Sequence, residues 1–163
     1  MSEKVEVSVL EALSLLGEGY SLADLAGVKP EQMEALYALA YQYYNAENFE
    51  DAANIFKALC LYDPSDERFF MGLAACQQSL KQYKIAADTY SVCSVLSGLK
   101  DPKPMYFAAL CLLKDGRRDE AVVALKSLEI MGRDGEFADE DHNYMNKGAQ
   151  LLQVLESAAG KEA

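Results

Sequence analysis

The sequence predicts an all-α protein of three consecutive helical hairpins, which stack in a right-handed superhelix between N- and C-terminal capping helices. Two observations support this prediction. Apolar and small residues recur with a period of about 34 residues, and the composition favours helix, with only four prolines and ten glycines in 163 residues. A chain of this length can bury a sufficient core as one domain.

The repeat is clearest in its alanines. Each hairpin has one on its first helix and one on its second, so that the two helices can approach closely while larger residues fill the remaining space. This is the pattern of the tetratricopeptide repeat, and it predicts three units at about 33–66, 67–100 and 102–135, within residues 31–131. The alanines of the first helices are Ala40, Ala74 and Ala109, and those of the second are Ala52, Ala86 and Ala121.

Polar segments separate the predicted helices. Residues 45–48, 81–82 and 115–116 predict the turns within hairpins. Two Asp-Pro segments, 63–66 and 101–104, fall between repeats, where proline is compatible with the first turn of the next helix.

The two ends of the chain predict caps for the stack. Residues 1–30 form an N-terminal helical region, in which an amphipathic helix from Ser8 to Leu16 is followed by a glycine-containing break and a short turn that Ser21 caps. Residues 132–163 comprise an acidic loop and a capping helix from about Asp141 to Ala158, with a frayed tail.

Charge and composition argue against several functions. The formal net charge is −11 and the sequence pI is about 4.5, so a nucleic-acid partner is not expected. No apolar run reaches the roughly 20 residues of a membrane helix, and the start lacks the features of a secretory signal. We therefore expect a cytoplasmic protein without stable membrane association.

Catalytic and metal-binding patterns are also missing from the sequence. It has no nucleophile paired with a base and no glycine-rich phosphate loop, which predicts that it is not an enzyme and has no cofactor. The four cysteines form no CxxC pair, and we expect them to be buried and reduced. The acidic residues 136–141 lack the ligand order of an EF-hand, which favours a solvated loop over a calcium site.

The first helix of the first repeat is apolar or aromatic around nearly its whole circumference. Leu36, Leu39, Ala40 and Tyr43 are expected to pack inside the repeat, while three tyrosines share a different face. These tyrosines either pack against the N-terminal helix or a second subunit, or they line a groove that binds a peptide. The groove interpretation includes the residues in the same phase of the next repeats, and its full set is Tyr37, Tyr41, Tyr44, Met71, Ala75, Gln78, Tyr106 and Leu110. Arg68 and Lys103 are expected to be solvated charges at its rim.

Four segments resemble one known family. They are YSLADL at 20–25, LYALAYQYY at 36–44, AANIFKALC at 52–60 and FMGLAAC at 70–76. Together they are similar to the class II chaperones of bacterial type III secretion, which escort the two pore-forming translocator proteins. The resemblance covers about residues 10 to 130. Tyr41 stands where the family often has Phe, and residues 104–109 depart further.

The resemblance implies a function that the spacing alone does not show. Family members bind an extended translocator segment of Pro-x-Leu-x-x-Pro character in their concave groove, keep the client soluble and export-competent, and often form dimers. Here the groove aromatics would be Tyr37, Tyr41 and Tyr44. A homodimer would form through the N-terminal helix, by Val9, Leu10, Leu13 and Leu16.

Two alternatives belong to other classes of protein. A generic tetratricopeptide adaptor that grips a C-terminal carboxylate needs Lys, Arg and Asn on its concave helices, where this chain has Tyr37 and Tyr41. A regulatory partner of a transcription factor is the second alternative, and no residue decides for or against it.

Overall fold

The computed structural model describes residues 14–134 and 137–159, and every regular element within these ranges is a helix. Residues 14–17 are helical. The other helices are α2 (Leu22–Ala26), α3 (Pro30–Asn45), α4 (Phe49–Tyr62), α5 (Glu67–Ser79), α6 (Tyr83–Leu96), α7 (Pro102–Lys114), α8 (Arg118–Asp134) and α9 (Asp139–Ala159).

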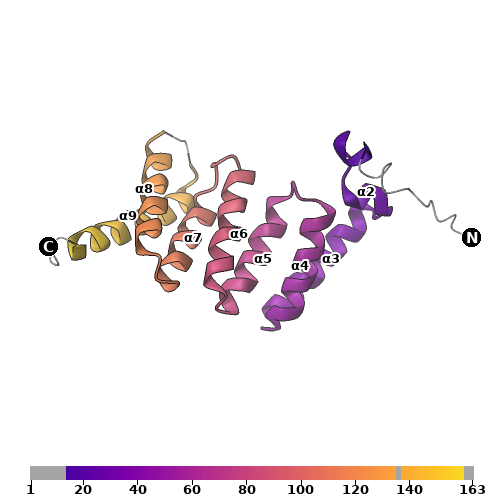
Figure 1. Ribbon diagram of the computed structural model, residues 1–163, viewed down its shortest axis with the longest axis horizontal. Helices are drawn as coiled ribbons and strands as arrows, with labels where there is room; N and C mark the ends of the chain where they lie inside the picture. Colours follow the sequence, from indigo (N-terminus) through magenta and orange to yellow (C-terminus); the bar gives the residue numbers. More distant parts are fainter. Residues whose placement is uncertain (1–13, 135–136, 160–163) are drawn as a thin grey trace, which may run out of the picture.

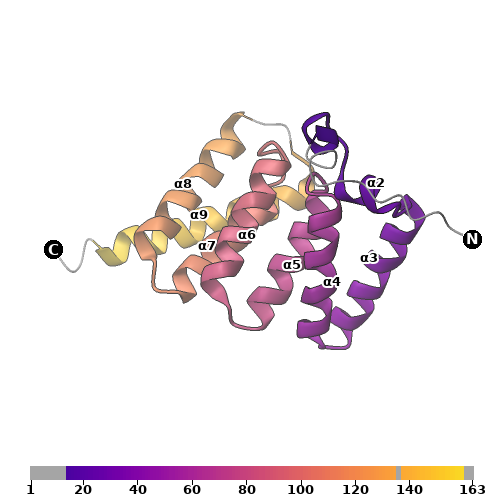
Figure 2. The same ribbon diagram turned by 45° about the vertical axis from the view of Figure 1, so that its right-hand side comes forward.

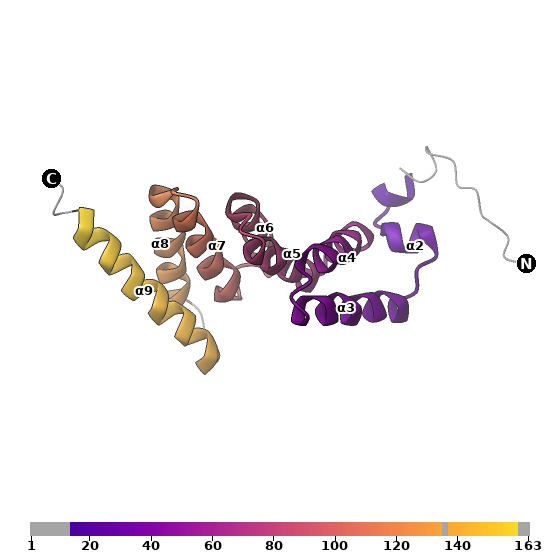
Figure 3. The same ribbon diagram turned by 90° about the horizontal axis from the view of Figure 1, so that it is seen from below.

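The helices pair into three stacked hairpins, α3 with α4, α5 with α6, and α7 with α8. From α3 to α9 each helix packs against the next, and the hairpins form a row with α2 and α9 at opposite ends (Figure 1). Helix α9 runs along α7 and α8 and covers the C-terminal end of the row (Figure 2). Seen from below, α3, α5 and α7 follow one another along the row (Figure 3). The predicted all-α fold of tetratricopeptide hairpins is confirmed. The division of the chain at residues 30 and 131 stays a prediction.

The alanines occupy the positions that the repeat assigns to them. All six are completely buried, so the hairpin helices meet at their backbones. Large side chains fill the space beside these contacts, and the largest of them, Phe56 of α4 and Phe69 of α5, are buried in the first core cluster.

The turns within the hairpins share one backbone geometry. Glu47, Lys81 and Gly116 occupy equivalent positions and have positive φ angles of 60°, 61° and 80°. The next residue in each turn donates its N–H to a carbonyl in the last turn of the preceding helix, at 2.9 Å in all three cases. This is a Schellman-type end, in which glycine is favoured because a Cβ is strained in the left-handed region. Only the third turn has the glycine.

We therefore expect Glu47→Gly and Lys81→Gly each to raise the free energy of unfolding by about 0.5–1 kcal/mol, because the relief of left-handed strain exceeds the added entropy of the unfolded chain. Urea unfolding followed by circular dichroism measures the change. Lys57→Gly, at an exposed position inside α4, is the control and should lower the same free energy by about 1 kcal/mol. Destabilisation by all three glycines would contradict the strain argument.

Several details differ from the sequence predictions. Leu39 is 39% exposed and not packed inside the repeat, and it lines an open hollow together with Leu36 and Tyr62. Pro64 lies in the turn before α5, whereas Pro102 and Pro104 occupy the first turn of α7 as expected. The predicted acidic loop is shorter, since α9 begins at Asp139.

The short turn at the N-terminal end is confirmed. Ser21 caps α2, with its Oγ accepting from the N–H of Asp24 while the Asp24 carboxylate accepts from the N–H of Ser21. The hydrogen bond from the Ser21 backbone lowers the pKa of Asp24. Of the predicted dimerisation residues, Val9, Leu10 and Leu13 lie outside the described residues, as does the predicted frayed tail from Gly160. Leu16 is 38% exposed.

Candidate functional site

Helix α3 places a row of aromatic rings over the junction of the first two repeats. The ring centroid of Tyr37 lies 4.9 Å from that of Tyr41, 6.1 Å from that of Phe56 and 5.7 Å from that of Phe69. Tyr41 also contacts Phe56, with centroids 5.6 Å apart. The tyrosines therefore pack on their own hairpin and on α5, which the sequence alternatives had not included. Tyr41 stays 37% exposed, whereas Tyr37 is half-buried.

A hollow of about 140 Å³ opens beside these rings, and we call it the tyrosine hollow. It brings together Tyr37 and Tyr41 from α3 with Met71 from α5, three of the residues predicted from the sequence. Burial raises the pKa of Tyr37, so its hydroxyl remains neutral and able to donate a hydrogen bond. Three charged residues and one cysteine complete the lining of the hollow. They are Glu67, Arg68, Asp101 and Cys93.

The other predicted groove residues lie outside the tyrosine hollow. Tyr44 turns its ring toward Phe49, at a centroid distance of 5.3 Å. Gln78 is half-buried and its Oε1 accepts a hydrogen bond from the hydroxyl of Tyr90 at 2.8 Å, which leaves its amide N–H groups for other partners. Ala75 is half-buried on α5, between Met71 and Gln78 in the sequence.

At the far end of the row the predicted residues meet the C-terminal helix. The ring of Tyr106 on α7 lies 5.6 Å from that of Tyr144 on α9, and Leu110 is half-buried further along α7. The predicted set is therefore spread along α3, α5 and α7. Its role in binding a peptide stays a prediction, and Tyr144 is an aromatic neighbour that the sequence analysis did not single out.

Arg68 is engaged in the structure and is not the freely solvated charge that we expected. Its Nη2 lies 2.7 Å from Oε1 of Glu34 on α3 and 2.7 Å from Oδ2 of Asp66. Its guanidinium carbon stands 4.9 Å from the centroid of the Tyr37 ring. Hydrogen bonds to Asp66 and then to Glu34 raise the pKa of Arg68 further, so it is always charged.

The repeat period contains a signal for this contact. Glu34 and Arg68 are 34 residues apart, so they occupy equivalent positions on neighbouring first helices. Lys103 is the corresponding residue of the third repeat, and its Nζ lies 3.6 Å from carboxylate oxygens of both Glu140 and Asp141 in the first turn of α9. The period is therefore a sequence signal for the ion pair of Glu34 with Arg68, whereas the contacts of Lys103 with α9 do not follow the period.

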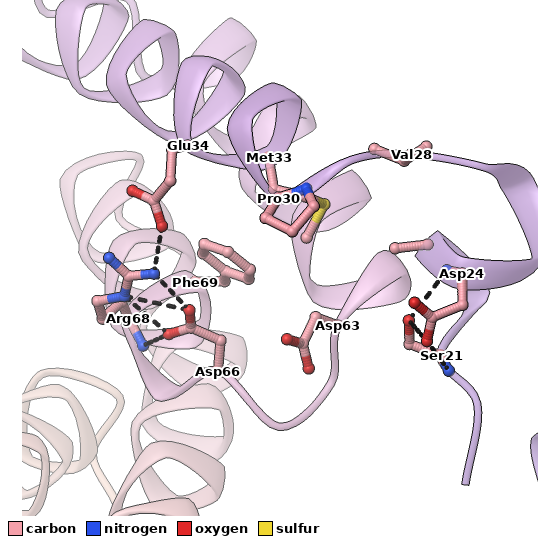
Figure 4. Close-up of a pocket in the computed structure, with 11 residues that line it drawn as sticks. Ser21, Asp24, Val28, Pro30, Met33, Glu34, Asp63, Asp66, Arg68 and Phe69 are labelled. Carbon is pink, nitrogen blue, oxygen red and sulfur yellow. Dashed lines mark hydrogen bonds and ion pairs between the residues drawn. The ribbon is translucent and has the colours of Figure 1, made fainter.

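A second hollow, of about 250 Å³, lies at the N-terminal end of the row, and we call it the acidic hollow (Figure 4). Met33 and Phe69 contribute apolar surface, and the carboxylates of Asp24, Asp63 and Asp66 surround it. Arg68 lines both hollows, so the tyrosine hollow and the acidic hollow adjoin at this side chain.

The four cysteines are free and buried, as predicted. Burial raises the pKa of Cys93, next to the tyrosine hollow, to about 12, and that of Cys76 to about 11. These thiols are protonated at neutral pH, and neutral thiols pack as small apolar groups.

Comparison with known proteins identifies the family. A family model described as tetratricopeptide repeat matches residues 33–66 and 69–97. The chain is 33% identical to the chaperone protein SicA of Salmonella typhimurium over 157 residues, which is 96% of this chain and 88% of that protein. The chain belongs to the class II type III secretion chaperones. It is also 40% identical to the low calcium response locus protein H of Yersinia pestis over 108 residues, which is 66% of this chain and 64% of that relative.

Solved structures of type III secretion proteins share the architecture. A type III secretion complex from Aeromonas hydrophila matches with a TM-score of 0.81 and 31% identity, covering 91% of this chain and 97% of that one. The chaperone SycD of Yersinia enterocolitica, solved in complex with a peptide of the translocator YopD, matches with a TM-score of 0.72 and 32% identity, covering 81% and 98%. Among the residues described here, no helix is long and apolar enough to cross a membrane.

Proposed function

We propose that this protein is a cytoplasmic bacterial chaperone for type III secretion translocators, which binds an extended N-terminal client segment along its first helices. The tyrosine hollow carries this proposal, because it combines the exposed Tyr41 with the half-buried Tyr37 and Met71 in a chain whose family includes SycD, solved with a YopD peptide. Holding the segment keeps the client soluble and competent for export.

The chemistry of the hollow suits an apolar, extended ligand. Tyrosine offers a rigid ring and a hydroxyl, so it contributes contact area at a small entropic cost, and Met71 adapts to the shape of the bound side chain. Prolines in the client favour an extended conformation and so reduce the entropy lost on binding. A client with membrane-inserting helices exposes apolar surface that would otherwise aggregate.

The same proposal assigns no enzymatic activity, because binding alone accounts for the role. It is also preferred over a carboxylate-gripping adaptor, since Asp66 and Glu34 already neutralise Arg68, the cation of the tyrosine hollow.

We further propose a homodimer. An apolar hollow of about 410 Å³, lined in part by Val28, Leu36, Leu39 and Tyr62, is open on α3 and α4 and could receive a helix. This helix would come from a second subunit and would contact the hollow through Val9, Leu10, Leu13 and Leu16. Sedimentation equilibrium gives the molecular mass of the full chain and of a variant that lacks residues 1–13. The full chain should have the mass of a dimer and the variant that of a monomer.

The function is tested by titrating a fluorescein-labelled YopD peptide into the protein and following anisotropy. We expect saturable binding, and much weaker binding of a peptide with the same composition in scrambled order. Replacing the Pro and Leu residues of a Pro-x-Leu-x-x-Pro segment in the peptide by alanine should also abolish most of the affinity. Equal binding of the native and scrambled peptides, or no binding of the YopD peptide, would contradict the proposal.

A further inference from the structure

Arg68 occupies the point at which the first and second repeats meet on the side of the tyrosine hollow. Its side chain starts from the first turn of α5 and reaches Glu34 on α3, so it spans the two first helices. Because Arg68 lines both the tyrosine hollow and the acidic hollow, a chain running from one hollow to the other passes over its guanidinium group.

The position of this guanidinium group is set by several contacts. Nε donates to both carboxylate oxygens of Asp66, at 3.0 and 3.1 Å, and Nη2 donates to Asp66 and to Glu34, at 2.7 Å each. Asp66 is itself held as the N-cap of α5, where Oδ1 accepts from the backbone N–H of Arg68 at 3.0 Å. The flat group also lies 4.9 Å from the Tyr37 centroid and 5.6 Å from the Phe69 centroid. An arginine held at this many points has lost most of its conformational freedom before any ligand arrives.

These contacts use three of the five N–H donors of the guanidinium group. Both hydrogens of the third nitrogen, Nη1, make no hydrogen bond within residues 14–134 and 137–159, and Figure 4 shows this nitrogen pointing away from the two carboxylates. The side chain is 46% exposed, so a ligand can reach it. A fixed, charged and unused donor therefore stands next to the aromatic surface.

An extended peptide carries acceptors that need such a donor. Each residue of a bound strand presents a carbonyl, and a proline-containing segment makes no internal hydrogen bonds. A carbonyl that loses water on binding costs free energy unless a donor replaces it. Because Asp66 and Glu34 neutralise Arg68, a neutral carbonyl suits Nη1 better than a second carboxylate would.

We propose that Arg68 is a client-binding residue whose Nη1 donates to a main-chain carbonyl of the extended segment where it crosses the junction of the first two repeats. Glu34 and Asp66 are the positioning residues for this contact. The inference rests on the proposed function and adds to it a fixed register, since one carbonyl of the client must lie opposite Nη1.

The test uses the full chain and the fluorescein-labelled YopD peptide. Arg68→Lys keeps the charge but lacks the planar fork, and we expect it to weaken peptide binding about 10-fold, in line with the loss of one hydrogen bond to a charged group. Arg117→Lys is the matched control, because Arg117 is also paired with two carboxylates, Asp88 and Glu120, and lies outside both hollows. It should leave the affinity unchanged.

An ester series locates the carbonyl. Peptides in which one amide at a time is replaced by an ester have a weaker acceptor at that position. One ester should weaken binding to the wild-type protein about 10-fold and have little effect on binding to the Arg68→Lys variant, because the hydrogen bond is already lost there.

The outcomes separate this inference from the proposed function. Wild-type binding that Arg68→Lys leaves unchanged, or an ester effect of equal size in both proteins, would overturn the role of Arg68 and leave the groove in place. Absence of wild-type binding to the YopD peptide would overturn the proposed function itself. Circular dichroism and the urea midpoint of Arg68→Lys should match those of the wild type, and a loss of affinity together with a loss of helix would count against a direct contact.

Discussion

Replacing Tyr41 and Met71 together by alanine is expected to weaken binding of the YopD peptide about 100-fold, because aromatic and large apolar side chains at the centre of an interface supply most of its affinity. Both residues line the tyrosine hollow, and Tyr41 is 37% exposed, so part of its surface is open to a ligand. Tyr37 is better changed to Phe, because its ring also packs on Phe56 and Phe69. Anisotropy measures each affinity.

The matched control removes two exposed apolar side chains that do not line the tyrosine hollow. Leu61 on α4 and Val95 on α6 are 66% and 72% exposed. Leu61→Ala with Val95→Ala should leave peptide affinity within about twofold of the wild type, as is common for residues outside an interface. If the control lost as much affinity as the Tyr41 and Met71 pair, or if that pair bound like the wild type, the tyrosine hollow would not be the binding site.

The largest effect on stability is expected at Phe56. Its ring is completely buried under Tyr37 and Tyr41 and touches α5 at Gly72, where a Cβ would overlap the ring. Phe56→Ala should lower the free energy of unfolding by about 4 kcal/mol through lost burial and a cavity, and Gly72→Ala by about 2 kcal/mol through overpacking. Urea unfolding followed by circular dichroism gives both values.

The close contact predicts a definite coupling between the two positions. Phe56→Leu shortens the side chain and should make room for the methyl group of Gly72→Ala, so the double variant should be less destabilised than the sum of its two single variants. Val95→Ala, on the exposed face of α6, should change the free energy of unfolding by less than about 0.5 kcal/mol. Additive losses at positions 56 and 72 would contradict the direct overlap of the added methyl group with the ring.

The two predictions concern one structural unit. Phe56 supports the two tyrosines that line the hollow, so packing inside the first hairpin and the shape of the candidate site depend on the same ring. Variants that loosen this ring should therefore lose peptide affinity even where the exposed atoms of Tyr41 remain.

Much of the fold follows from the sequence because the repeat is local and periodic. The alanines at equivalent positions specify where two helices touch, and the buried alanines of the structure are those that the period of about 34 residues selects. The same period placed Tyr37, Tyr41 and Met71 on one side of the first two hairpins, and these three do meet in one hollow. Periodicity assigns a residue to a face of its helix, which is why this part of the site was predictable.

Other features depend on which neighbours a helix has and how closely they approach. Leu39 has an apolar position in the pattern, yet it is exposed and lines an open hollow with Leu36 and Tyr62. Tyr144 approaches Tyr106 because α9 packs along α7, an arrangement that the weak pattern after residue 132 did not specify.

The sequence by itself determined the helical repeat, the buried small residues and the aromatic face of the first helix, because each depends on spacing within a helix or a hairpin. Tertiary structure decided that the Arg68 guanidinium lies over the Tyr37 ring, pairs with Asp66 as well as Glu34, and keeps its Nη1 without a hydrogen-bond partner among the described residues. Side-chain contacts of this kind depend on the distance and angle between helices of adjacent repeats. These are set by the packing of large side chains such as Phe56 against Gly72, which no one-dimensional pattern contains.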